Sequence, residues 1–308
     1  MARNIWRGFR RRYATPAIWV VLTPMVAAAG AAGADLSIDP CTIDGQHPHI
    51  VLVTEEGTIV IELFPEAAPS AIASLIRLVE GPIFLPDLTV NSRVGDEVGY
   101  YDGLVFDEAT RGGFITTALR RPLRAILIET EIDADAVGLD QRKITSREDA
   151  MFVWQHELLP YQTNLPDDSL VPPMLTGWLQ TWSETFDPEF LIGVSRKEIN
   201  EALGYSYRSG LDSRPVTRGA VSLEPASPQW STPRLMIALK TISSEDGRRM
   251  VIGRVAEGLD IADRISTGRM SPAKAVQFRP LVPVRIFKAS VECRDVKFED
   301  LEKEGAHQ

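Results

Sequence analysis

Residues 50–81 constrain the fold more than any other part of the chain. Residues 50–54 are rich in β-branched side chains, and residues 58–64 place Ile59, Ile61 and Leu63 on one face, so each segment predicts a β-strand. The intervening Glu55-Glu56-Gly57 has turn chemistry and predicts a hairpin. Apolar residues at helical spacing then predict an amphipathic helix that ends at Gly81. A hairpin followed at once by such a helix indicates a β-barrel with a helix over one end.

A second β-rich region follows a long stretch of different character. Short strands are predicted in two groups, before and after residues 119–217, and a short helix is predicted at residues 259–265. Within residues 119–217 the pattern predicts three helices, at residues 149–159, 175–185 and 196–203, separated by Pro-rich loops. The chain therefore reads as one β domain interrupted by a largely helical insertion.

The first 34 residues have the composition of an export signal. They contain five arginines and no acidic residue, and an apolar run over residues 17–34 ends in Ala32-Gly33-Ala34. This pattern predicts a secretory signal peptide cut near Ala34. The alternative is an uncleaved signal-anchor, which would be the protein's only attachment to a membrane. Either way, we expect an exported protein of the periplasm or cell envelope. Residues 301–308 form a charged tail.

The charge balance excludes some partners. The chain has 33 basic and 42 acidic residues, so loss of the leader's five arginines would change the net charge from −9 to −14. A chain this acidic is repelled by nucleic acid and by anionic membrane surfaces. No spacing indicates a cofactor or a metal site, since His47 and His49 are two ligands without a carboxylate or thiol cluster.

Two further groups of residues leave alternatives open. Cys41 and Cys293 lie near opposite ends of the exported part and could form a disulfide in an oxidising compartment, or could be two independent buried thiols. Glu129, Glu131 and Asp133 alternate with apolar or neutral residues. The simplest interpretation is the solvated face of a strand, and the alternative is a carboxylate metal site.

Four blocks of sequence, in order, resemble the cyclophilin family of peptidyl-prolyl cis-trans isomerases. They are Thr54-Glu-Glu-Gly-Thr-Ile-Val-Ile-Glu-Leu-Phe-Pro-Glu-Ala-Ala-Pro69, Tyr101-Asp-Gly-Leu-Val-Phe106, Gly219-Ala-Val-Ser222, and Asp246-Gly247 with Val251-Ile-Gly-Arg-Val-Ala-Glu-Gly-Leu-Asp260. The resemblance implies a mainly β fold: a closed eight-stranded antiparallel barrel with capping helices, over residues 35–300 and interrupted by insertion 119–217. In that fold the first and last strands are neighbours, so a Cys41–Cys293 bridge is geometrically reasonable.

The chemistry of that family needs a positive group that this chain lacks at the usual place. Rotation about an X-Pro bond breaks amide resonance, against a barrier of about 18–20 kcal/mol. A fixed donor near the prolyl nitrogen favours the twisted state. The family uses the arginine of a Phe-His-Arg motif, which corresponds here to Phe106-Asp107-Glu108. A carboxylate, Glu108, therefore replaces the guanidinium.

The resemblance also implies a substrate-binding set, with one candidate to replace the lost arginine. The set is Phe106, Phe114, Ile115, Thr117 and Met236. Alternatively, these side chains simply fill the barrel core. Arg234 aligns with a pocket glutamine and is the best substitute, ahead of Arg111 and Arg249, unless it is a solvated surface arginine.

Two functions follow from this resemblance. The first is an isomerase of the cell envelope that acts on proline-containing exported polypeptides with weak or altered activity. The second is a catalytically inactive binding or scaffold module, whose helical insertion contacts a partner such as an envelope protein.

Overall fold

The computed structural model describes residues 41, 46–81, 99–120, 126–164, 171–271 and 278–295. The predicted leader (residues 1–34) and charged tail (residues 301–308) lie outside the described residues. No helix among the described residues is long and apolar enough to cross a bilayer.

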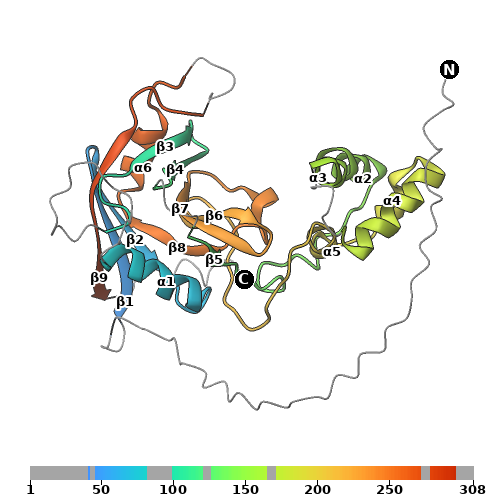
Figure 1. Ribbon diagram of the computed structural model, residues 1–308, viewed down its shortest axis with the longest axis horizontal. Helices are drawn as coiled ribbons and strands as arrows, with labels where there is room; N and C mark the ends of the chain where they lie inside the picture. Colours follow the sequence, from blue (N-terminus) through green and yellow to red (C-terminus); the bar gives the residue numbers. More distant parts are fainter. Residues whose placement is uncertain are drawn as a thin grey trace, which may run out of the picture. The chain divides into compact units, whose positions relative to one another are not determined.

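Eight antiparallel strands form a closed barrel (Figure 1). They run in the order β4-β3-β9-β1-β2-β8-β6-β7, and pairing of β4 with β7 closes the ring. This confirms the predicted fold. The strands are β1 (Gln46–Thr54), β2 (Gly57–Leu63), β3 (Val105–Thr110), β4 (Phe114–Thr117), β6 (Ala220–Ser227), β7 (Trp230–Ala238), β8 (Val251–Glu257) and β9 (Val284–Asp295). A two-residue strand, β5 (Ile128–Glu129), pairs with the start of β7.

The barrel closes around the apolar face of each strand. Ile50 of β1 lies opposite Ile61 of β2, and Leu52 lies opposite Ile59. All four are fully buried in one core cluster. Burial of such side chains contributes about 1.5–3 kcal/mol each, so the alternation visible in the sequence determines which face turns inward.

Two helices pack against the same core. Helix α1 (Pro69–Glu80) buries the apolar face predicted from its spacing, including Ile72 and Leu75. Helix α6 (Leu259–Ser266) contributes Ala262 and Ile265. Gly258, which precedes α6, has a φ of 85°, and a Cβ there would lie 2.4 Å from the carbonyl oxygen of Thr58. Only glycine allows this close approach between helix start and strand.

The insertion is helical and has its own apolar core. It contains α2 (Arg147–Val153), a π-helical turn (Trp154–Leu158), α3 (Leu159–Asn164), α4 (Pro173–Thr185), the 3₁₀ turn Pro188–Leu191 and α5 (Arg196–Ala202) (Figure 1). Trp154 is fully buried and stacks on Trp182, with ring centroids 4.7 Å apart. Leu158, Leu175 and Ile199 complete this second cluster.

The alternating carboxylates are not the solvated face of a strand. Only Glu129 is exposed, whereas the exposed fraction is 2% for Glu131 and 8% for Asp133. Strand β5 ends at Glu129, so Glu131 and Asp133 lie outside the strand, and the alternation does not place their side chains on a solvated strand face. Glu131 instead accepts hydrogen bonds from the backbone N–H groups of Ser70 (3.0 Å) and Ala71 (3.1 Å). It therefore caps α1, for which Ala68 supplies no side-chain cap.

Asp133 has a similar buried role. Its carboxylate accepts backbone N–H groups from Asp135 (2.9 Å) and Gly210 (2.7 Å) and so holds two insertion loops together. Burial alone would raise the pKa of Asp133, but these backbone donors outweigh it and lower the pKa below its ordinary value. Among the described residues, no cluster of three or more side chains is suited to hold a metal ion.

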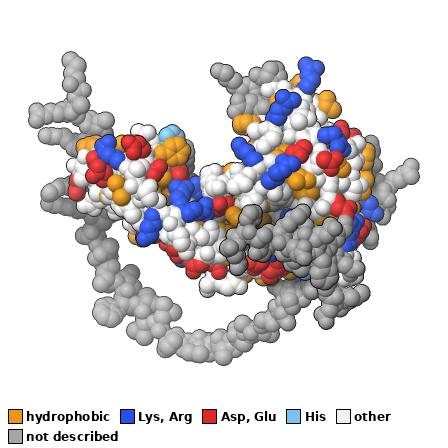
Figure 2. Space-filling view, turned by 180° about the vertical axis from the view of Figure 1, so that it is seen from behind, with side chains coloured by type: hydrophobic (Ala, Val, Ile, Leu, Met, Phe, Trp, Pro, Cys, Tyr) orange, Lys and Arg blue, Asp and Glu red, His pale blue; other side chains and the backbone are white. Residues whose placement is uncertain are grey.

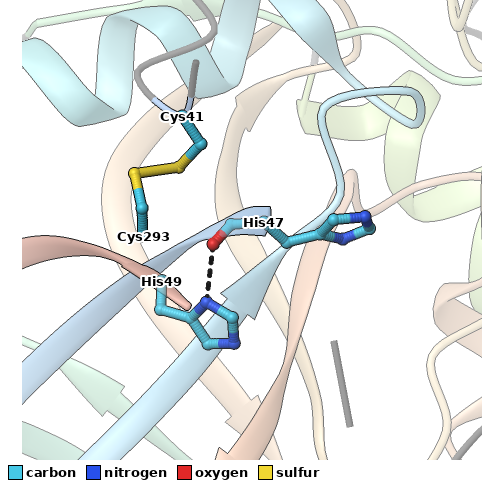
Figure 3. The surroundings of a disulfide bond; sticks show 4 residues. All are labelled: Cys41, His47, His49 and Cys293. Atoms are coloured by element: carbon cyan, nitrogen blue, oxygen red, sulfur yellow. Dashed lines mark hydrogen bonds between the residues drawn. A yellow bond between two sulfur atoms is a disulfide. The ribbon is translucent and has the colours of Figure 1, made fainter. Parts of the chain in front are cut away.

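A disulfide joins Cys41 to Cys293, with Cα atoms 5.5 Å apart (Figure 3). Cys293 lies on β9 opposite Pro48 of β1, so the neighbouring first and last strands bring the two cysteines together. His47 and His49 lie beside the bridge in Figure 3, and a ring nitrogen of His49 is 2.8 Å from the carbonyl oxygen of His47.

Charged side chains of both signs are intermixed on the face shown in Figure 2. Exposed ion pairs such as Arg218–Asp263 (2.6 Å) and Arg264–Asp260 (2.7 Å) bring side chains of opposite charge together.

Candidate functional site

Strands β3, β4 and β7 carry the residues that the sequence resemblance assigns to a substrate-binding site. Ile115 lies opposite Ile237, and both belong to the barrel core. Because side chains alternate along a strand, their neighbours face outward. Phe114 and Met236 accordingly belong to a separate small cluster outside the barrel core, together with Val216, Ala220, Ala238 and Val251.

The predicted substrate-binding residues divide between these two faces. Phe106 and Ile115 are fully buried in the barrel core, where the alternative interpretation placed them. Thr117 is also fully buried, and its hydroxyl accepts the backbone N–H of Leu235 at 2.9 Å. Met236 is 2% exposed. Phe114 alone of the five is half-buried, so the substrate-binding role of the set stays a prediction.

Sequence reasoning missed Thr116. This residue lies directly opposite Met236 and therefore shares its outward face, whereas Ile115 and Ile237 face the core. The sequence could have indicated this, because side chains alternate between the two faces of a strand, so Thr116 shares the face of Phe114.

Arg234 is not a solvated surface arginine. Its side chain is 19% exposed and reaches from β7 towards β3 and β4. Its Nε donates to the carbonyl oxygen of Thr117 at 2.7 Å. Its Nη2 donates to Asp107 at 2.9 Å and to Glu108 at 3.3 Å. Asp107 and Glu108, which the resemblance aligned with a His-Arg pair, are thus the partners that hold Arg234.

The guanidinium of this group comes from β7, and its counter-ions Asp107 and Glu108 lie on β3. Two carboxylates face one arginine, so the group carries a net charge of −1. Arg234 is bound at Nε and Nη2, while its Nη1 donates to no other residue in the described part of the chain. The Nη1 group therefore remains able to donate a hydrogen bond to a ligand.

Arg249 is engaged in a second group of ion pairs. It contacts Glu224 of β6 through Nη1 at 2.8 Å and Glu245 through Nε at 2.8 Å. Burial lowers the pKa of Arg249, but the two carboxylates outweigh this effect and raise it above its ordinary value. Arg111, the remaining candidate, is exposed in the turn between β3 and β4. Of the three candidate arginines, Arg234 is the one that pairs with Glu108.

The Asp246-Gly247 motif anchors the insertion. Arg142 pairs with Asp246 at 2.9 Å, and the other carboxylate oxygen of Asp246 accepts the backbone N–H of Val216 at 2.7 Å. The Tyr207 hydroxyl donates to the carbonyl oxygen of Gly247 at 3.1 Å. These contacts tie the insertion to the loop that precedes β8.

Comparisons with known proteins give matches among solved structures. The chain is similar to two structures of a cyclophilin type peptidyl-prolyl cis-trans isomerase from Cryptosporidium parvum. One of them was solved in the presence of the dipeptide Ala-Pro; it has a TM-score of 0.41 and a sequence identity of 10%, and the match covers 79% of this chain and 98% of that chain. The other has a TM-score of 0.40 and a sequence identity of 11%, and the match covers 80% of this chain and 98% of that chain. Neither protein-family profiles nor curated protein sequences give a match. The fold assignment rests on the closed strand order.

Proposed function

We propose that this protein is a cyclophilin-like peptidyl-prolyl isomerase of the cell envelope that acts weakly on exported, proline-containing polypeptides. The observation that carries the proposal is the position of Arg234. It offers Nη1 as a donor beside Glu108, at the place that corresponds to the family's arginine, while Nε and Nη2 are held by Thr117 and the two carboxylates.

The electrostatics explain why we expect weak activity. A positive donor near the prolyl nitrogen stabilises the twisted amide, because the nitrogen lone pair becomes available when conjugation is lost. Asp107 and Glu108 lie within 3.3 Å of the guanidinium and oppose its field. The carboxylates therefore position Arg234 and at the same time reduce its effect on the substrate.

Export is supported by two features. The leader has the composition of a signal peptide. Cys41 and Cys293 form a disulfide, a bond typical of oxidising compartments.

The test is the cis-to-trans rate of a short Ala-Pro peptide with the purified protein. We expect a small acceleration that is lost in Arg234→Ala and retained in the control Arg111→Ala, which removes an exposed arginine nearby in the β3–β4 turn. No acceleration by the folded wild type would refute an isomerase function.

A second function is favoured by the burial of the expected proline pocket. Phe106, Ile115 and Met236 are 0–2% exposed, which leaves little apolar surface for a proline ring. The barrel would then be an inactive scaffold that binds partners through its insertion. Absence of catalysis together with retained binding of a partner by the insertion would favour this alternative.

A further inference from the structure

The charged residues of the chain are unevenly distributed. Residues 264–291 contain no acidic residue and six basic ones: Arg264, Arg269, Lys274, Arg279, Arg285 and Lys288. Without the leader's five arginines the net charge is −14, and this stretch contributes +6 to it, so the remainder carries −20. A cluster of one sign in a chain of the opposite sign creates a local field at that part of the surface, which here is positive.

Most of these basic side chains have no counter-ion. Four of them are exposed and form no ion pair within the described residues: Arg269, Arg279, Arg285 and Lys288. Arg264, by contrast, pairs with Asp260 at 2.7 Å. Glu55 borders the cluster, but it accepts the backbone N–H of Arg285, at 3.0 Å, rather than its guanidinium. The positive charge is therefore available to an external partner.

Large apolar side chains are exposed beside these charges. Residues 278–288, here called the basic segment, include four such residues, each 44–81% exposed: Phe278, Leu281, Val282 and Phe287. Single exposed apolar residues are common on soluble proteins, but four in one short segment form a local apolar surface. Figure 2 shows basic and hydrophobic side chains next to one another at the upper right of the molecule.

A β-bulge contributes to this exposure. Val53 of β1 pairs with Lys288 of β9, whereas Thr54 pairs with Ile286, so Phe287 has no partner on β1. Ile286 is fully buried, while Phe287 and Lys288 are both exposed. The bulge therefore places an apolar and a basic side chain in succession on the outer surface.

The backbone of the basic segment is held in place by the barrel. The carbonyl oxygen of Phe278 accepts the N–H of Ala109 on β3 at 2.7 Å, and the N–H of Leu281 donates to the carbonyl oxygen of Arg269 at 2.8 Å. The chain before β9 is drawn in orange-red above β3 in Figure 1. Side chains on a fixed backbone can bind without first ordering the chain, which lowers the cost of association.

We propose that the basic segment binds the surface of an anionic lipid membrane. Arg279, Arg285 and Lys288 meet the anionic headgroups, because basic side chains are attracted to such a surface. Leu281 and Val282 enter the boundary between headgroups and acyl chains, where burial of apolar area adds to the affinity. None of these residues belongs to the Arg234 group, so this binding does not depend on isomerase activity.

The net negative charge of the chain does not prevent this contact. Charges more than about 8–10 Å apart are largely screened at physiological ionic strength, so a lipid surface at the basic segment responds mainly to the unpaired cations there. A lipid surface fits better than an acidic polypeptide, because Val282 is 81% exposed. A folded partner would need a pocket matched to this side chain, whereas acyl chains deform around it.

The test is a fluorescent label at Val282→Cys in the full chain. The two native cysteines form the disulfide, so this substitution supplies a single free thiol. A fluorophore whose emission rises in an apolar environment then reports insertion of the basic segment itself, because a molecule held only by its leader keeps this label in water. We expect emission to rise with vesicles of phosphatidylcholine and phosphatidylglycerol, with affinity about tenfold higher than for phosphatidylcholine alone. The same label at Phe152→Cys, a position of the insertion that is 58% exposed, should not respond.

Two matched double variants of the Val282→Cys chain test the charges. Arg279→Gln/Arg285→Gln removes two unpaired cations of the basic segment and should weaken binding to the anionic vesicles at least tenfold, to about the level of high salt. Arg77→Gln/Lys143→Gln removes two exposed, unpaired cations from α1 and the insertion and should leave the affinity unchanged. Circular dichroism confirms that each variant is folded.

Three outcomes would overturn the proposal. They are an unchanged emission of the Val282→Cys label with anionic vesicles, an equal affinity in the two double variants, and a response to polyglutamate but not to vesicles, which would assign the segment to an acidic polypeptide. The Ala-Pro isomerase assay of the wild type is a separate readout, so each proposal fails on its own result.

Discussion

Substitution of Glu131 tests whether the insertion stabilises the barrel. Glu131 receives two backbone N–H groups at the start of α1 and pairs with Arg208 at 2.9 Å, and it is 2% exposed. Loss of a helix cap costs about 0.5–2 kcal/mol, and removal of one partner from a buried ion pair adds to this. We expect Glu131→Ala to lower the free energy of unfolding by about 3 kcal/mol. Glu131→Gln keeps an acceptor oxygen and should cost about 1–2 kcal/mol.

Glu129 provides the matched control, because it pairs with the same Arg208 but is 54% exposed on its side chain. Exposed ion pairs contribute about 0–1 kcal/mol, so Glu129→Ala should change stability little. Urea unfolding of the three variants, followed by tryptophan fluorescence, gives the free energies. The reasoning fails if Glu131→Ala costs no more than Glu129→Ala.

Three further predictions concern stability. The pKa of Asp133 is lowered in the folded protein, so its carboxylate stabilises the fold above its unfolded pKa, near 4, and this contribution is lost as the pH falls through the folded pKa. Asp133→Asn should therefore reduce the dependence of the free energy of unfolding on pH, measured by urea unfolding between neutral and acid pH. An unchanged pH dependence in the variant would contradict this. Replacement of both Cys41 and Cys293 by serine removes a bridge across a sequence separation of 252 residues and should lower the free energy of unfolding by about 4–5 kcal/mol. An equal urea unfolding midpoint of the wild type with and without reductant would show that the bridge adds no stability. Gly247 has a φ of 73°, and a Cβ there would lie 2.2 Å from Leu139 of the insertion; Gly247→Ala should cost about 1–3 kcal/mol, and a wild-type unfolding midpoint would rule out this close contact.

The barrel could be predicted from the sequence because its signals are local and repeated. In the hairpin's second strand Ile59, Ile61 and Leu63 recur with a period of two, and in the helix after it apolar residues recur every three to four positions, so both patterns reflect burial of one face. The helical character of the insertion followed from the same kind of periodicity.

The polar groups of the site could not be predicted in this way. Arg234 and Glu108 are 126 residues apart, and Glu131 is 60 residues from the N–H of Ala71. Such pairs depend on which strands become neighbours, which the local pattern does not specify. The alternation of Glu129 and Glu131 suggested solvent exposure, but tertiary structure supplied buried partners for Glu131 that outweigh the cost of burying its charge. The outward position of Thr116 is the exception, since strict alternation along β4 places it on the same face as Phe114.

The double variant Asp107→Asn/Glu108→Gln is the most direct test of the account. It removes both negative charges beside Arg234 but keeps the size of each side chain and one acceptor oxygen in each. At separations of about 3–4 Å and near a protein surface, each carboxylate interacts with the guanidinium by several kcal/mol. Without these carboxylates the positive charge of Arg234 is no longer offset, so we expect kcat/KM for a short Ala-Pro peptide to rise about tenfold, a change of about 1.4 kcal/mol in the activation free energy. The control Glu80→Gln removes an exposed carboxylate elsewhere and should leave kcat/KM unaltered. A rate equal to or lower than that of the wild type, in a folded variant, would contradict the claim that these carboxylates restrain Arg234.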